Sequence, residues 1–75
     1  MCLAVPGRIE SIDGEYAVVD IVGNRVNAMT ALVPEARVGD WVLVHAGLAV
    51  TVMSEEEARE TLDLIEEKYS IEDGQ

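Results

Sequence analysis

One thiol and one imidazole are the side chains in this sequence best suited to chemistry. The 75 residues contain a single cysteine, Cys2, and a single histidine, His45. A thiolate and an imidazole are ligands for soft or borderline metals, and a thiolate is also a nucleophile. Two ligands cannot hold a metal alone, because structural zinc sites use four protein ligands and catalytic ones three. If both residues bind a metal, we expect a partner or the cargo to supply the missing ligands.

The same two residues do not suggest an enzyme. No set of nucleophile, base and orienting group can be assembled from the sequence, so we predict no catalytic residue. Transfer of a soft metal group between proteins suits a thiolate better than hydrolysis does. Each residue also has a purely structural interpretation, Cys2 as an inert small apolar residue and His45 as a half-buried, hydrogen-bonded strand residue.

The position of Cys2 bears on its acidity and on the compartment. A small residue after Met1 ordinarily permits removal of the initiator methionine, and a protonated terminal amine would then favour the thiolate. Pro6 and Gly7 are expected to separate this short arm from the first strand. The start lacks the basic region and the long apolar core of a signal peptide or membrane span. With one cysteine and no intrachain disulfide, these features predict a cytoplasmic protein with no membrane partner.

The charge of the chain is strongly negative, and it argues against nucleic acid as a partner. Fifteen acidic and five basic residues give a net charge of −10. Residues 54–75 hold nine of the acids and two of the bases, so most of the excess lies in the C-terminal segment. A phosphate-backbone ligand needs clustered Lys and Arg, which this chain lacks.

The elements that must position Cys2 and His45 are mainly β-strands. Short runs rich in Val and Ile alternate with turn residues, including the pairs Asp13-Gly14 and Gly23-Asn24. Such short strands bury themselves best by curling, so we predict a small, partly open, five-stranded OB-like barrel over 1–53. An isolated Gly47 predicts a bend directly after His45. The predicted strands are 8–12, 15–22, 25–33, 41–46 and 48–53.

A single helix is predicted after the barrel. Ser54 and Glu57 form a capping box, and acidic residues follow at the positive end of the helix. The spacing predicts a helix over 54–69 and a frayed tail over 70–75, within one domain of residues 1–75. By strand alternation, His45 shares a face with Trp41 and Leu43. The apolar stripe of the helix consists of Ala58, Leu62, Ile65 and Tyr69.

Three segments resemble the hydrogenase assembly chaperones of the HypC/HupF type. They are MCLAVPGRI at 1–9, GDWVLVHAGLA at 39–49 and EARETLDLIEE at 57–67, in the order found in that family. Two positions depart from the family pattern. Leu48 stands where Phe is common, so the position stays apolar and an aromatic contact is not expected there, and Trp41 stands where Tyr is common.

The resemblance implies a chaperone of [NiFe]-hydrogenase maturation. Such a protein pairs with the scaffold protein HypD while an iron bearing cyanide and carbon monoxide, Fe(CN)2CO, is assembled. It then delivers the iron fragment to the hydrogenase large-subunit precursor and keeps no cofactor permanently. In the family, the cysteine after the initiator methionine is essential for complex formation and iron binding, and it maps onto Cys2. The strand histidine, a second iron-associated residue, maps onto His45.

The expected sites follow from this resemblance. Iron binding is predicted at Cys2 and His45, and partner binding at Cys2, Leu3, Pro6, Gly7 and His45. Two alternatives stay open at this stage. A plain interaction module would dock a protein through the barrel and the acidic helix, with Cys2 incidental, and an OB-type nucleic-acid binder conflicts with the charge.

Overall fold

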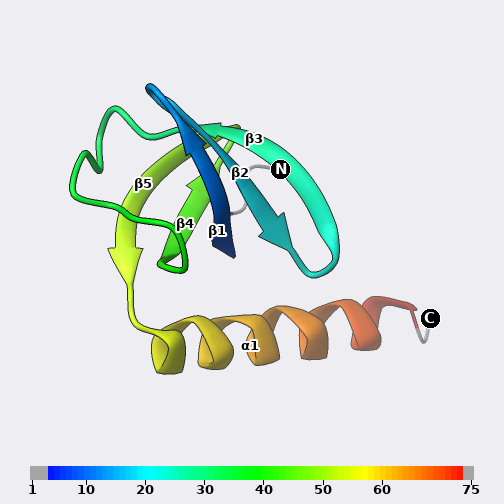
Figure 1. Ribbon diagram of the computed structural model, residues 1–75. Coiled ribbons are helices and arrows are strands. Elements are labelled where there is room, and N and C mark those ends of the chain that lie inside the picture. The colour runs from blue at the N-terminus through cyan, green and yellow to red at the C-terminus, as the bar shows by residue number, and fades with distance from the viewer. Residues whose placement is uncertain (1–3, 74–75) are drawn as a thin grey trace.

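The computed structural model shows a five-stranded barrel with one helix below it (Figure 1). It describes the backbone of residues 4–73 and the side chains of residues 4–64. The strands follow the order β1-β2-β3-β5-β4 around a closed barrel, so the predicted OB-like architecture is confirmed and the barrel is closed rather than partly open. The elements are β1 (Val5–Asp13), β2 (Tyr16–Ile21), β3 (Asn24–Met29), β4 (Trp41–His45), β5 (Leu48–Met53) and α1 (Glu55–Asp73).

The barrel has one broad closing contact and one narrow one. β1, β2 and β3 form the predicted antiparallel meander, β4 pairs with β5, and β1 also pairs with β4 along four residues. β3 and β5 run parallel and are joined by a single residue pair, Met29 with Leu48. The barrel is therefore closed mainly by β1 and β4.

The core is built from small and β-branched side chains, which suit the narrow interior of a five-stranded barrel. Val42 is 0% exposed and Val44 is 5% exposed, so the inward face of β4 is the one opposite His45, as alternation predicts. Val33 is buried as well, although it lies beyond the end of β3. The buried cluster comprises Ile9, Ala17, Val19, Ala28, Val33, Val42, Val44 and Ala49.

The first strand begins earlier than predicted. Pro6 and Gly7 are residues of β1, paired with Leu43 and Val42 of β4, rather than a separator between the arm and the strand. Proline is tolerated there because β2 pairs with β1 only from Arg8 onward, which leaves one edge of β1 free at Pro6.

Gly7 lets β1 pass close to the side chains of β2. A Cβ atom at Gly7 would lie 2.3 Å from Cγ1 of Val19 and 2.8 Å from Cγ1 of Ile21. Both distances are below van der Waals contact, so the missing side chain is what allows this approach.

Two of the turns differ from the predicted ones. The β2–β3 turn is formed by Val22 and Gly23, with φ angles of 50° and 90°, rather than by Gly23 and Asn24. The β1–β2 turn is shifted the other way, one residue later than predicted, with Gly14 first and Asp13 still paired in β1. In the β2–β3 turn, positive φ at both Val22 and Gly23 is the geometry of a type I′ hairpin, which matches the twist of the strands. Tertiary pairing therefore places a β-branched residue in a conformation that it rarely adopts.

The predicted third strand is shorter than expected, because the chain turns away from the sheet at Thr30. The Thr30 N–H donates to the Glu15 carbonyl oxygen at 2.7 Å, and the Thr30 hydroxyl donates to the same oxygen at 3.0 Å. These bonds tie the chain to the β1–β2 turn, and β3 ends at Met29 instead of at Val33.

The capping box starts α1 as predicted. The Glu57 N–H donates to Ser54 Oγ and the Ser54 N–H donates to Glu57 Oε1, both at 3.0 Å. The helix extends to Asp73, four residues past the predicted end, so residues 70–73 of the frayed tail predicted over 70–75 are helical, and residues 74–75 lie outside the described residues. The extension has a simple cause, since the first helix-breaking residue after the cap is Gly74.

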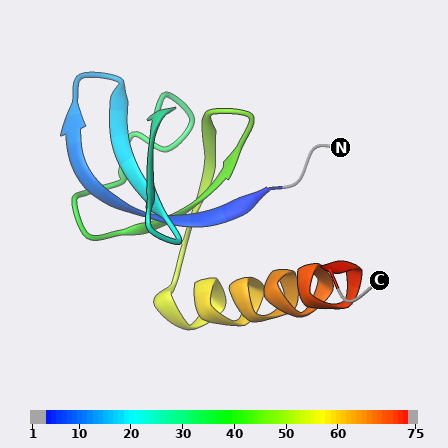
Figure 2. The same ribbon diagram turned by 90° about the vertical axis from the view of Figure 1, so that its right-hand side faces the viewer.

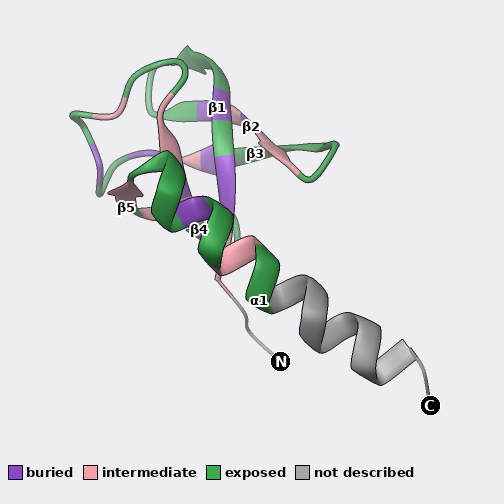
Figure 3. Cartoon of the chain, turned by 90° about the horizontal axis from the view of Figure 1, so that it is seen from below, coloured by how far each residue is buried: buried purple, intermediate pink, exposed green. Residues whose placement is uncertain are grey.

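One face of α1 packs against β1 and β4 (Figure 3). Ala58 is 0% exposed and Leu62 is half-buried, so the first two members of the predicted apolar stripe face the barrel. Ile65 and Tyr69, the other two, have side chains outside the described residues. Within the described part of the chain, no helix has both the length and the apolar content that crossing a membrane requires.

Candidate functional site

His45 is the last residue of β4 and is half-buried on its outward face. Leu43 and Trp41 share that face and are also half-buried. The turn to β5 follows at once, through Ala46 and Gly47, with φ angles of 55° and 79°. The bend predicted at Gly47 is thus a tight hairpin turn, which holds the end of β4 in a defined position.

No side-chain hydrogen bond among the described residues involves the His45 ring. If His45 had only a structural role, we would expect it to be half-buried and to form such a bond. The half-burial is observed, whereas the described residues provide no hydrogen-bond partner.

The start of β1 lies beside the end of β4. Val5 pairs with Val44, so His45 is one residue beyond the first paired position of β1 (Figure 2). Cys2 and Leu3 lie outside the described residues. The topology therefore brings the root of the N-terminal arm to the same end of the barrel as His45.

Val5 was not among the predicted site residues, although its pairing fixes where the arm leaves the barrel. A usable signal was present, because Ala4 and Val5 are apolar residues directly before Pro6 and could have extended the first strand. The Pro-Gly pair was interpreted as a break in the chain, so the first strand was predicted to begin only after it.

Pro6 and Gly7 are buried. Alternation places Pro6 on the face of β1 opposite to Gly7 and the core residue Ile9. α1 packs on β1 and β4 from the outside of the barrel. Because Pro6 and Gly7 are buried, we expect them to act by positioning the arm, and their partner-binding role stays a prediction.

No group of three or more His, Cys, Asp or Glu side chains with metal-binding geometry occurs among the described residues. The two ion pairs of the described residues lie on two separate surfaces. On α1, Arg59 donates to Glu55 at 2.6 Å, and Glu56, Glu60 and Asp63 are exposed.

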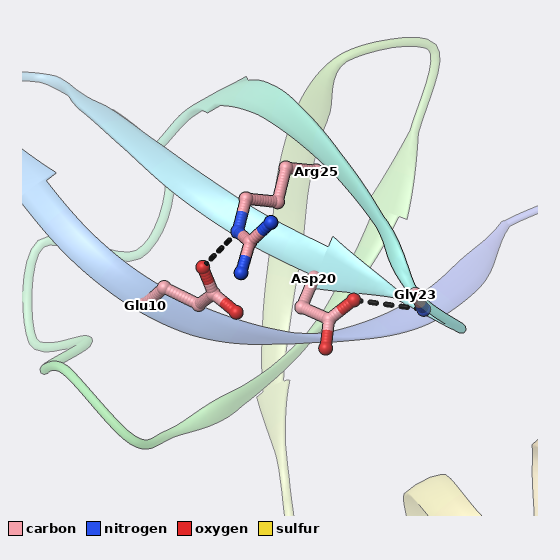
Figure 4. A network of polar contacts seen from close by, with 4 residues as sticks. All are labelled: Glu10, Asp20, Gly23 and Arg25. Atoms are coloured by element: carbon pink, nitrogen blue, oxygen red, sulfur yellow. Dashed lines mark hydrogen bonds and ion pairs between the residues drawn. The ribbon is translucent and has the colours of Figure 1, made fainter.

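The second charged surface is the outer face of β1, β2 and β3 (Figure 4). Arg25 Nε donates to Glu10 Oε1 at 2.6 Å, and the Gly23 N–H donates to Asp20 Oδ1 at 2.8 Å. The hydrogen bond to Glu10, followed by the negative charge of that carboxylate, raises the pKa of Arg25 above its ordinary value. Arg25 and Glu10 therefore form an ion pair on this face, with the Arg25 side chain 70% exposed.

Comparison with known proteins identifies the family of this chain. The sequence model of the HupF/HypC family matches residues 1–65, a range that includes both Cys2 and His45. The chain belongs to the HupF/HypC family.

Several relatives bear the name hydrogenase maturation factor HypC. The protein from Escherichia coli K12 is 44% identical over 96% of this chain and 87% of its own length. The protein from Azotobacter chroococcum mcd 1 is 46% identical over 89% of this chain and 81% of its own length. The protein from Helicobacter hepaticus is 42% identical over 89% of this chain and 80% of its own length.

Proposed function

We propose that this protein is a chaperone of [NiFe]-hydrogenase maturation that carries iron. It pairs with the scaffold protein HypD while the Fe(CN)2CO group is assembled, and then delivers that group to the hydrogenase large-subunit precursor. Membership of the HupF/HypC family and the names of the relatives support the maturation role. Those relatives are named factors rather than enzymes, in agreement with the prediction of a non-enzyme.

The observation that carries the iron role is the pairing of Val5 with Val44. Cys2 is three residues before Val5, and three residues of extended chain span at most about 11 Å. Since His45 directly follows Val44, a thiolate from the arm and the His45 imidazole can meet at this end of the barrel.

The chemistry expected of this pair is shared coordination. A thiolate and an imidazole suit a low-valent iron fragment, and two protein ligands leave the remaining positions to cyanide, carbon monoxide and a partner. Such an incomplete set favours transfer, because the next protein can add its ligands before these two leave. A thiol ligand must stay reduced, which is consistent with a cytoplasmic location.

The proposal assigns different tasks to the two ligands. His45 sits at the end of a strand whose opposite face is buried, so its backbone is held rigidly. Cys2 belongs to the arm that leaves β1 beside it. We therefore expect Cys2 to deliver the iron contact to partners and His45 to orient or complete it.

The test is anaerobic affinity purification of the C-terminally tagged protein from its own hydrogenase-producing cells. Wild type, Cys2→Ala and His45→Ala are compared, and bound iron and co-purified proteins are quantified. We expect iron together with HypD or a large-subunit precursor on wild type, and loss of both with Cys2→Ala at an unchanged melting temperature. Val44→Ala is the matched control, because it weakens the fold at the same end of the barrel without removing a ligand.

Two outcomes would reject the iron role of Cys2. If the same partners and the same iron accompany Cys2→Ala, the protein docks through its surface, and charge reversal at the exposed Glu60 and Asp63 would then abolish binding. If His45→Ala melts at a much lower temperature than wild type, His45 is a structural residue. Intact-mass measurement of the native protein shows whether Met1 is removed and hence whether an α-amine can assist the thiol.

A further inference from the structure

β3 has a free edge along most of its length. It pairs with β2 from Asn24 to Met29, whereas its pairing with β5 is limited to Met29 and Leu48. Figure 1 shows β3 and β5 meeting near one end and then diverging. From Asn24 to Ala28, the side of β3 away from β2 is unpaired by any described strand.

The backbone pattern shows which groups face this edge. The Met29 N–H donates to the Gly47 carbonyl oxygen at 2.9 Å, so the polar groups of Met29 point away from β2. In an antiparallel ladder, N–H and C=O groups point to the same side at every second residue. Arg25 and Asn27 therefore direct their N–H and C=O groups to the free edge, where no described residue pairs with them.

The side chains of β3 do not shield this edge. Edge strands are commonly protected by a charged side chain that opposes the approach of another strand. The charged side chain here is Arg25, and its guanidinium reaches across β2 to Glu10 on β1, away from the edge (Figure 4). Val26 is 37% exposed, and Asn27 is exposed and uncharged.

We propose that the Arg25–Asn27 edge of β3 accepts an extended segment of a partner protein as an additional β-strand. The free groups are alternating backbone donors and acceptors, and an extended polypeptide is the ligand that complements them. The segment would place an apolar side chain against Val26. It would carry no acidic residue, because the barrel residues 1–53 are net negative, with six acids against three bases. The same charge disfavours a second copy of the chain as the occupant.

This inference does not rest on the proposed iron role, since it uses neither Cys2 nor His45. The probe is a synthetic peptide, Lys-Thr-Val-Thr-Val-Thr-Lys, added to the isotopically labelled full chain. Amide hydrogen exchange by NMR reports the edge directly. In the free protein we expect fast exchange at Arg25 and Asn27 and protection at Val26 and Ala28, whose N–H groups face β2.

Binding should protect the two edge amides specifically. At a peptide concentration about ten times its Kd, exchange at Arg25 and Asn27 should slow by about tenfold, because only the free fraction exchanges. Protection of both amides in the free protein, or no change with peptide at millimolar concentration, would overturn the proposal.

A pair of variants isolates the edge from the fold. Asn27→Pro removes an N–H that faces the edge, and it breaks no hydrogen bond to β2. Asn27→Thr keeps that N–H. Peptide binding should be lost in Asn27→Pro and retained in Asn27→Thr, at similar melting temperatures. Equal binding by both variants contradicts strand addition. A wild-type dimer in sedimentation that Asn27→Pro dissociates would show that a second copy occupies the edge, and it would overturn the choice of a partner segment.

Discussion

Replacing Gly7 with alanine tests how β1 is held in place, and through it the position of the N-terminal arm. The new methyl group would lie 2.3 Å from Cγ1 of Val19 and 2.8 Å from Cγ1 of Ile21. Val19 is 0% exposed and has no space into which to rotate. One of the two strands must therefore move.

The magnitude follows from two opposing effects. Inserting a methyl group into a filled core costs about 1–3 kcal/mol in the free energy of unfolding. Alanine also restricts the unfolded chain, which returns about 0.4–1 kcal/mol where the native φ is permitted, and Gly7 is not among the positive-φ residues. The two ranges leave a net loss of about 0–2.6 kcal/mol, and the 2.3 Å approach to a fully buried side chain favours the upper part, about 1–2.6 kcal/mol. Such a loss lowers the Tm of a domain this small by roughly 4–20 °C.

The assay is urea unfolding followed by the fluorescence of Trp41, the single tryptophan. Val19→Ala alone should cost about 2 kcal/mol through lost burial and the resulting cavity. In the double variant, alanine at position 19 removes the closer of the two atoms against which the new methyl clashes, whereas the contact with Ile21 remains. The loss in the double variant should therefore be smaller than the sum of the two single losses, a departure from additivity.

The reasoning would be refuted if Gly7→Ala were as stable as wild type, or if its cost added fully to that of Val19→Ala. Either result would mean that β1 does not approach β2 as closely as described. A normal stability with lost partner binding would instead restore a direct binding role for Gly7, since packing would then no longer explain the effect.

Three further predictions concern single positions. Val22→Asn should raise the free energy of unfolding by about 1 kcal/mol in urea titration. Val22 has a φ of 50° and is 63% exposed, and asparagine tolerates that conformation. A destabilised variant would contradict the turn geometry. Ser54→Ala should lower the free energy of unfolding by about 1 kcal/mol, because it removes the hydrogen bond from the Glu57 N–H, and circular dichroism should show reduced helicity. Ser54→Thr should retain most of this stability. Val44→Ala should lower the free energy of unfolding by about 1–3 kcal/mol. Partner binding should fall only in proportion to the unfolded fraction, and a fully folded variant that no longer binds would contradict this prediction.

Local signals predicted the features that depend on local chemistry. The capping box at Ser54 and Glu57 is formed by residues three apart, and both of its hydrogen bonds are present. Alternation grouped His45 with Trp41 and Leu43 on the face of β4 opposite Val42 and Val44. The structure shows that Val42 and Val44 are buried, so the face of His45 is the outward one.

The features that depend on distant residues were predicted poorly. Pro6 and Gly7 have low strand propensity, but pairing with β4 and the close approach to Val19 override it. The turn at Val22 is shifted because the register of β2 and β3 follows the core, at the expense of local φ preference. Such effects require knowledge of which strands become neighbours.

The position of Cys2 relative to His45 was predicted only from the family resemblance. The structure adds the pairing of Val5 with Val44, which depends on barrel closure and leaves no mark in either segment alone. Nothing in the spacing of residues 5 and 44 indicates that their strands are adjacent.

The closing contact between β1 and β4 also sets the order of events during synthesis. Cys2 leaves the ribosome first, whereas the strand that ends at His45 follows about forty residues later, which is several seconds at about 5–20 residues per second. Until β4 has emerged and docked, β1 has no neighbour for its first residues, because β2 pairs with β1 only from Arg8. A nascent or unfolded chain therefore displays the thiol without the imidazole held beside it. A factor that requires both groups would engage only molecules whose barrel has closed.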